Sequence, residues 1–165
     1  MGHSQSGSGS GSGSGLSILF VEDCQYVSEM IGRIIATKFP CVTVYVAGNG
    51  KIGLDLFKEH LPDLIITDIN MPEMDGIQMA TEIKSVRNDA RFIVLTGNSD
   101  EDLLDKFSKI GYEDFMIKPI EFNRLFAAIE KCIAEFMQGS ISFSGAGRVL
   151  NHSMGTYGIP LTQAA

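Results

Sequence analysis

Short apolar runs and longer amphipathic stretches alternate five times between residues 16 and 137. Each short run is almost continuously apolar, which is typical of strands that are buried on both faces. Each longer stretch repeats its apolar residues every three or four positions, which is typical of a helix that buries one face. The alternation therefore predicts five βα units around a parallel sheet. The expected strands span residues 17–21, 42–46, 63–67, 91–95 and 113–117.

The amphipathic stretches predict five helices, whose ends are marked by residues that start or stop a helix. Pro40 follows the first helix, Pro62 follows the second and Gly111 follows the fourth. Ser99 is the expected N-cap of the fourth helix, and acidic residues in its first turn suit the positive end of the helix dipole. The expected helices span residues 25–39, 50–60, 77–86, 100–110 and 121–137.

The two ends of the chain differ in composition from this central region. Residues 1–15 resemble an affinity-tag remnant followed by a Gly/Ser linker, with no apolar groups to bury. Residues 138–165 are again rich in Gly and Ser and show no sustained period. This tail is open to three interpretations: a vector-derived extension, a linker to an output domain, or a segment that docks elsewhere. One folded domain is therefore expected, at residues 16–137.

Composition and charge restrict the classes of function. The chain has 13 basic and 20 acidic residues, a net charge of −7, which argues against direct binding to nucleic acid or an anionic membrane. Its apolar runs are far shorter than the roughly 20 residues of a membrane-spanning helix. The sequence after Met1 also lacks the features of a signal peptide, so a cytoplasmic location is expected. Cys24, Cys41 and Cys132 lack CxxC spacing and are odd in number, so buried thiols are expected rather than disulfides or a zinc site.

Polar residues suited to phosphoryl chemistry stand where the predicted strands end. Glu22 and Asp23 follow the first strand, Asp68 the third, Thr96 the fourth and Lys118 the fifth. Because the carboxyl ends of parallel strands meet at one edge, these side chains are expected to converge. Clustered carboxylates repel one another unless a cation offsets their charge, and Mg²⁺ prefers such oxygen ligands. The pattern predicts a Mg²⁺ site in which Asp23 and Asp68 are direct ligands, beside an ammonium and a hydroxyl that can stabilise a phosphoryl group.

Four sequence motifs surround these residues. They are ILFVED at 18–23, DLIITDINMPEMDG at 63–76, VLTG at 94–97 and FMIKP at 115–119. Together they resemble the receiver domain of response regulators in two-component signal transduction, the family that includes the single-domain chemotaxis regulator. The resemblance covers residues 16–137. It implies a doubly wound α/β fold, a (βα)5 flavodoxin-like three-layer sandwich with a five-stranded parallel sheet of order 2-1-3-4-5.

The resemblance also implies a phosphoacceptor and a metal site. Asp68 corresponds to the residue that accepts the phosphoryl group. Glu22 and Asp23 correspond to the acidic pair that holds Mg²⁺ together with Asp68. The backbone carbonyl of Asn70 is then expected to complete the metal site.

Further residues correspond to the parts of the family that stabilise and transmit the phosphorylated state. Thr96 and Lys118 are expected to contact the phosphoryl oxygens. Phe115 stands at the aromatic switch position, where the ring changes exposure as Thr96 moves; a core Phe is the alternative. Asn70 and Asn98 are expected to influence how water reaches the acyl phosphate, and so to tune the lifetime of the signal.

By this resemblance a sensor histidine kinase or phosphotransfer protein donates the phosphoryl group to Asp68 with Mg²⁺ bound. The surface of the fourth helix, fifth strand and fifth helix then changes and contacts a target, an output domain or a second copy in a homodimer. The fourth helix offers Leu103, Leu104 and Phe107 beside exposed acids. The chain is expected to be a phosphoacceptor rather than an enzyme, with only weak self-catalysed phosphoryl transfer and autodephosphorylation.

Three rival functions make different demands on the sequence. A Mg²⁺-dependent aspartyl-phosphate phosphatase of the haloacid-dehalogenase type carries an Asp-x-Asp pair, whereas Asn70 stands two residues after Asp68. A docking-only receiver would lack Asp68, Asp23 or Lys118, and all three are present. A flavodoxin-type cofactor binder needs a phosphate-cradling loop after the first strand, where Glu22 and Asp23 would instead repel phosphate in the absence of metal.

Overall fold

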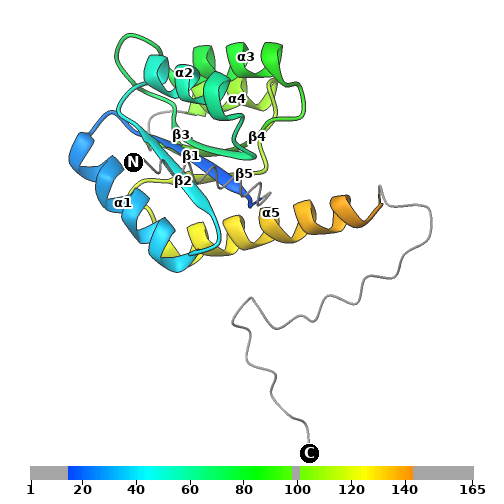
Figure 1. The fold of residues 1–165 in the computed structure, drawn as a ribbon. Helices are drawn as coiled ribbons and strands as arrows, with labels where there is room; N and C mark the ends of the chain where they lie inside the picture. Colours follow the sequence, from blue (N-terminus) through cyan, green and yellow to red (C-terminus); the bar gives the residue numbers. More distant parts are fainter. Residues whose placement is uncertain (1–14, 98–100, 143–165) are drawn as a thin grey trace, which may run out of the picture.

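Five parallel strands form one sheet in the order β2-β1-β3-β4-β5 (Figure 1). The computed structural model describes residues 15–97 and 101–142. Because β1 lies between β2 and β3, the chain winds outward from β1 in both directions, which is the predicted doubly wound order. The strands are β1 Ser17–Val21, β2 Thr43–Ala47, β3 Leu64–Asp68, β4 Arg91–Thr96 and β5 Asp114–Ile117.

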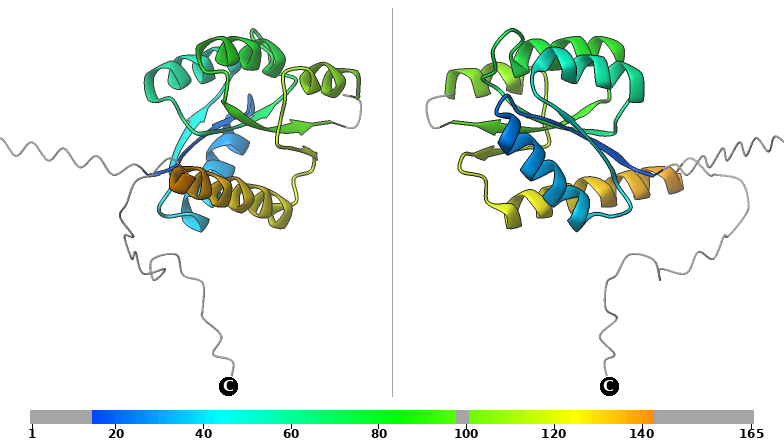
Figure 2. Two further views of the ribbon diagram at one scale, coloured as in Figure 1. Left: turned by 90° about the vertical axis from the view of Figure 1, so that its right-hand side faces the viewer. Right: turned by 60° about the vertical axis from the view of Figure 1, so that its left-hand side comes forward.

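Helices cover both faces of the sheet and make three layers (Figure 2). One core lies under α1 and α5, where Ile35 and Ile129 pack with Phe20 of β1. The other lies under α2, α3 and α4, where Phe57 and Met79 pack with Leu19 of the same strand. The continuous apolar runs are thus explained, since alternate residues of one strand enter opposite cores. The helices are α1 Gln25–Lys38, α2 Gly50–His60, α3 Gly76–Val86, α4 Glu101–Ser108 and α5 Phe122–Ser142.

The predicted strands and helices all occur, with boundaries that mostly shift by one or two residues. The largest difference is α5, which continues past the predicted end at residue 137 to Ser142. Gly139 and Ser140 are poor helix formers, so the sequence suggested an earlier end. Within the predicted span, Arg91 pairs with Glu135 at 2.7 Å and so joins α5 to β4. The predicted N-cap Ser99 lies outside the described residues.

The cysteine prediction was wrong for two of the three thiols. Cys24 and Cys41 are exposed, because Cys24 caps the start of α1 and Cys41 lies in the turn before β2. Cys132 is buried on the inner side of α5, and burial raises the pKa of its thiol to about 11. Within the described part of the chain, no helix combines the length and apolar character needed to cross a membrane.

Candidate functional site

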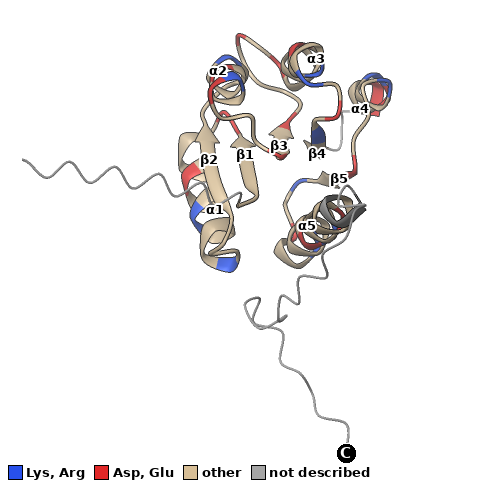
Figure 3. Ribbon diagram, turned by 45° about the vertical axis from the view of Figure 1, so that its right-hand side comes forward, with Lys and Arg blue, Asp and Glu red and all other residues tan. Residues whose placement is uncertain are grey.

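Three carboxylates meet at the carboxyl edge of the sheet, near the acidic segments that follow β1 and end β3 (Figure 3). Glu22, Asp23 and Asp68 each place a carboxylate oxygen within 4.8 Å of the others. β1 and β3 pair in parallel with Val21 opposite Thr67, so the residues that follow the two strands are brought side by side. Glu22 and Asp68 are only 3% and 6% exposed, whereas Asp23 is exposed. The predicted convergence of the acidic residues is present in the structure.

Lys118 brings the ammonium that lies among these carboxylates. Its Nζ donates hydrogen bonds to Asp68 Oδ2 at 2.6 Å and to Glu22 Oε2 at 2.7 Å. Its backbone N–H donates to the carbonyl of Thr96 at 2.8 Å, which extends the pairing of β5 with β4 to the site. The peptide bond between Lys118 and Pro119 is cis. The bond to Glu22 was not foreseen, because the motif linked Lys118 only to the phosphoryl oxygens.

Burial and charge change the ionisation of two of these groups. Burial raises the pKa of the Glu22 carboxyl and the charge of Asp68 adds to the rise, although the hydrogen bond from Lys118 opposes it. Burial lowers the pKa of the Lys118 amine, but hydrogen bonds to Asp68 and Glu22 outweigh this, so that the pKa is raised overall. One ammonium therefore lies among three carboxylates, two of which are buried. The surplus negative charge, carried entirely by oxygen atoms, suits a hard divalent cation.

The loop between β3 and α3 follows Asp68 directly and leads into a helix that begins close to it. Asp75 and Gln78 form a reciprocal capping box that starts α3, with Asp75 Oδ1 accepting the Gln78 N–H at 2.8 Å. Gly76 begins this helix directly over the end of β3, where a Cβ atom would collide with the carbonyl oxygen of Asp68. Only glycine permits this close approach. Asn70 lies in the same loop and is exposed.

The remaining predicted residues occupy the β4 and β5 side of the site. Thr96 ends β4, is 3% exposed and donates its hydroxyl to the carbonyl of Gly97 at 3.0 Å. It stands one residue beyond Leu95, the register partner of Asp68. Phe115 is half-buried against the core under α2, α3 and α4. Asn98 lies outside the described residues.

Sequence reasoning missed the group that holds the Phe115 backbone. Arg124 of α5 donates a hydrogen bond from Nη2 to the Phe115 carbonyl at 2.8 Å. Nothing in the motif of residues 115–119 points to this arginine, because it belongs to the next helix. Its only signal in the sequence is its place, one residue before the buried Leu125.

An open parallel sheet with an acidic cluster at its carboxyl edge defines a class of α/β protein whose ligands bind where the strand order reverses. The chain belongs to the response regulator receiver domain family, whose model matches residues 18–130. Receiver domains of this family serve two-component signalling, are mostly non-enzymatic and interact with kinases or phosphotransfer proteins. They bind Mg²⁺ at an acidic pocket, which corresponds to the carboxylate cluster described above.

Relatives show the same unit alone and within longer proteins. The chemotaxis protein CheY of Bacillus subtilis is 36% identical over 116 residues, which are 70% of this chain and 96% of that protein. The probable C4-dicarboxylate response regulator DctR of Bacillus subtilis is 33% identical over 114 residues, 69% of this chain but 50% of that protein. A solved structure, the N-terminal domain of an uncharacterized protein from Wolinella succinogenes, has a TM-score of 0.71 at 36% identity. The match covers 75% of this chain and 98% of that one.

Proposed function

We propose that Asp68 accepts a phosphoryl group from a sensor histidine kinase or a phosphotransfer protein. The observation that carries this proposal is the position of its carboxylate. Asp68 is nearly buried, 2.6 Å from the Lys118 ammonium and within 4.8 Å of two further carboxylates. In the transfer, an Asp68 oxygen forms a bond to phosphorus while the bond from phosphorus to the donor imidazole nitrogen breaks and that nitrogen regains a proton. The exposed side of the site, at Asp23, leaves room for a donor.

The residues present fit a Mg²⁺ ion. The Glu22, Asp23 and Asp68 side chains would hold it, with the backbone carbonyl of Asn70 as a further oxygen ligand. The surplus of two negative charges over Lys118 and the all-oxygen donor set support this assignment. When bound, the ion supplies positive charge that stabilises the oxygens of the transferring group.

The chain's own side chains would hold the acyl phosphate. Lys118 is already anchored by Glu22, so its ammonium can remain in the site and donate to a phosphoryl oxygen once Asp68 is modified. In this structure the Thr96 hydroxyl donates a hydrogen bond to the neighbouring carbonyl of Gly97. Rotation of this hydroxyl toward the phosphoryl group would exchange that bond for a charge-assisted one, which is stronger. Asn70 and Asn98 would set the access of water to phosphorus.

The proposed output is a change in the surface of α4, β5 and α5 as Thr96 and Phe115 shift. Leu103 and Leu104 are half-buried on α4 and can contribute to such a surface. Phe107 cannot, because it is fully buried in the core, so the expectation that it stands beside the exposed acids was wrong. A target, an output domain or a second copy in a homodimer would read this surface.

Intact mass spectrometry tests the proposal. The chain is incubated with acetyl phosphate and Mg²⁺, beside Asp68→Asn and a matched control, Asp55→Asn, which changes an exposed aspartate on α2. A gain of one phosphoryl group that requires Mg²⁺, persists in Asp55→Asn and is lost in Asp68→Asn is expected. No adduct in the parent chain would contradict a stable phosphoacceptor. A titration with beryllofluoride, a mimic of the phosphoryl group, then separates rapid dephosphorylation, which permits binding, from a docking-only domain, which does not.

A further inference from the structure

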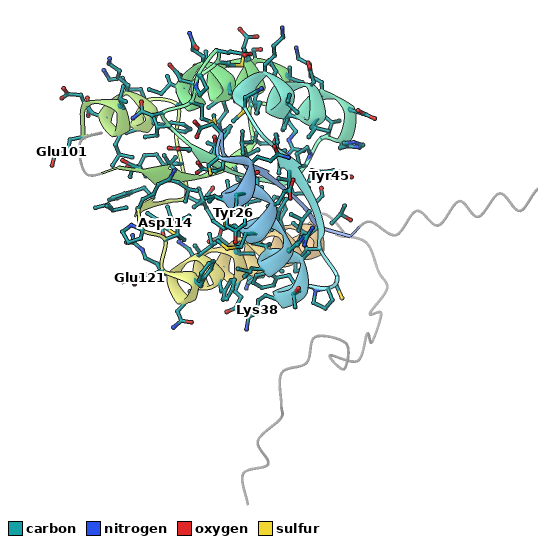
Figure 4. The ribbon with its side chains drawn as sticks, turned by 90° about the vertical axis from the view of Figure 1, so that its left-hand side faces the viewer. Tyr26, Lys38, Tyr45, Glu101, Asp114 and Glu121 are labelled. Carbon is teal, nitrogen blue, oxygen red and sulfur yellow. The ribbon has the colours of Figure 1, made fainter. Side chains whose placement is uncertain are left out.

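We propose that Arg124 is a positioning residue that holds Phe115 and the edge of β5 in the unphosphorylated arrangement and so connects the switch ring to α5. This inference rests on the proposed phosphorylation of Asp68. Asp114 on β5 and the start of α5, marked by Glu121, lie on the same side of the molecule (Figure 4). Arg124 lies in the first turn of α5 and bonds to the backbone of β5.

Arg124 contacts the backbone, the ring and the neighbour of Phe115. Its Nη2 donates to the Phe115 carbonyl at 2.8 Å and lies 3.4 Å from Asp114 Oδ1. The guanidinium carbon lies 5.8 Å from the centre of the Phe115 ring. Asp114 Oδ1 also accepts the N–H of Phe115 at 2.8 Å. Both backbone polar groups of Phe115 are therefore bound by side chains.

The position of β5 explains why this matters. β5 is an edge strand, and half of the backbone groups of an edge strand face away from the sheet. Those of Phe115 would be open to water or to another strand, but Asp114 and Arg124 occupy them. The aromatic switch position is thus fixed from its outer side by α5 rather than by a neighbouring strand.

The opposite side of the Phe115 ring contacts the rings next to α4. Tyr112 packs edge-on against Phe115 with centroids 6.0 Å apart, and Phe107 of α4 packs edge-on against Tyr112 at 6.3 Å. Phe115 therefore lies between an aromatic cluster on the α4 side and a cation on the α5 side. A rotation of the ring out of this place would lose the contact with Arg124 as well as that with Tyr112.

A contact that exists in only one of two states shifts the equilibrium toward that state. In this structure Lys118 Nζ donates a hydrogen bond directly to the unmodified carboxylate of Asp68, which we assign to the unphosphorylated arrangement. The Arg124 contacts accordingly oppose the phosphorylated arrangement, and by linkage they oppose anything that binds to it. Loss of a partly exposed cation–π contact corresponds to about two- to five-fold tighter binding of a ligand that selects the other state.

The test measures the dissociation constant of beryllofluoride, with saturating Mg²⁺, for the parent chain, Arg124→Gln and Lys131→Gln. Lys131 is exposed on α5, so the control removes the same charge from the same helix. Removing a positive charge alone would weaken binding of an anion, whereas the inference expects Arg124→Gln to bind about two- to five-fold more tightly. Arg124→Lys keeps the charge but loses the planar guanidinium, so its affinity should lie between those of the parent and Arg124→Gln.

A second readout separates positioning from a general loss of stability. The ring signals of Phe115 in ¹H–¹³C spectra of ligand-free Arg124→Gln should move toward their positions in the beryllofluoride-bound parent. Equal or weaker binding in Arg124→Gln than in Lys131→Gln, with unmoved Phe115 signals, would overturn the inference and leave the phosphoacceptor intact. A parent chain that binds no beryllofluoride would overturn the proposed function and the linkage together.

Discussion

At the amino end of β4 both partners of each ion pair are partly exposed, whereas at the carboxyl edge of the sheet two of the three clustered carboxylates are buried. Arg91 of β4 pairs with Glu135 at 2.7 Å and with Glu113 at 3.7 Å, and the side chains of these three residues are 27%, 37% and 35% exposed. Water screens such groups, so an excess of acid there costs little. The pair with Glu135 joins α5 to β4, and the pair with Glu113 joins β4 to the start of β5.

At the carboxyl ends of the strands, acidic and basic side chains again meet, but here an excess of acid is unfavourable. The side chains of Glu22 and Asp68 are only 4% and 9% exposed, and Lys118 is the one ammonium placed between them. Unbalanced charge in a poorly hydrated position is unfavourable until a cation or a neutralising modification arrives. Burial, rather than the number of charges, therefore separates a structural ion pair from a binding site.

The largest change in stability is expected from Lys118→Met. Without the ammonium, Glu22 and Asp68 remain buried with no opposing charge, which should lower the free energy of unfolding by about 3 kcal/mol in the absence of divalent cations. Urea unfolding at neutral pH with a chelator measures the loss. Lys51→Met on the exposed face of α2 is the control, and an equal loss in both variants would show that burial of the carboxylates is not the cause.

A smaller effect is expected at the opposite edge. Arg91→Met removes two half-exposed ion pairs and a contact over the Phe136 ring, and should cost about 1.5 kcal/mol. Mg²⁺ should stabilise this variant as much as the parent, because the two edges are independent. Unfolding curves with and without Mg²⁺ test this, and a variant that no longer responds to Mg²⁺ would contradict the separation.

Asp23→Asn should raise the stability of the chain rather than lower it. It removes one of three repelling carboxylates, so the chain should gain roughly 1 kcal/mol of stability when no divalent cation is present. The same change removes a metal ligand and should reduce the stabilisation by Mg²⁺. Thermal unfolding across a Mg²⁺ series measures both effects, with Asp55→Asn as the control that should show neither.

The smallest expected effect is a pH dependence. Because the pKa of Glu22 is raised on folding, the folded chain binds this proton more tightly than the unfolded chain. The contribution to stability is present below the ordinary pKa of 4.5 and is lost as the pH rises through the raised value. Stability without Mg²⁺ should therefore fall over this interval, and the fall should be smaller in Glu22→Gln. Denaturant midpoints at a series of pH values measure this fall. If the midpoint changes equally with pH in the parent chain and in Glu22→Gln, Glu22 is not the group responsible.

Much of the fold and the site follows from local patterns. A strand that is apolar on both faces ends where a polar residue appears, so the sequence alone predicts that Asp68 and Lys118 lie at one edge of the sheet. The end of α5 at Ser142 could not be predicted, because Gly139 and Ser140 are poor helix formers and favour an earlier end. The bonds of Lys118 to Glu22 and of Arg124 to Phe115 could not be predicted either, because they are tertiary. Such contacts arise from packing between elements, for which a sequence pattern within one element carries no signal.

The 21 residues of α5 form a rod of roughly 30 Å. Arg124 bonds to Phe115 from the first turn of this helix, at the end nearest the switch ring. Because the helix is long, each degree of tilt about that turn moves its far end by about half an ångström. A small displacement beside Phe115 would thus become a larger one at Ser142, the last described residue of the helix.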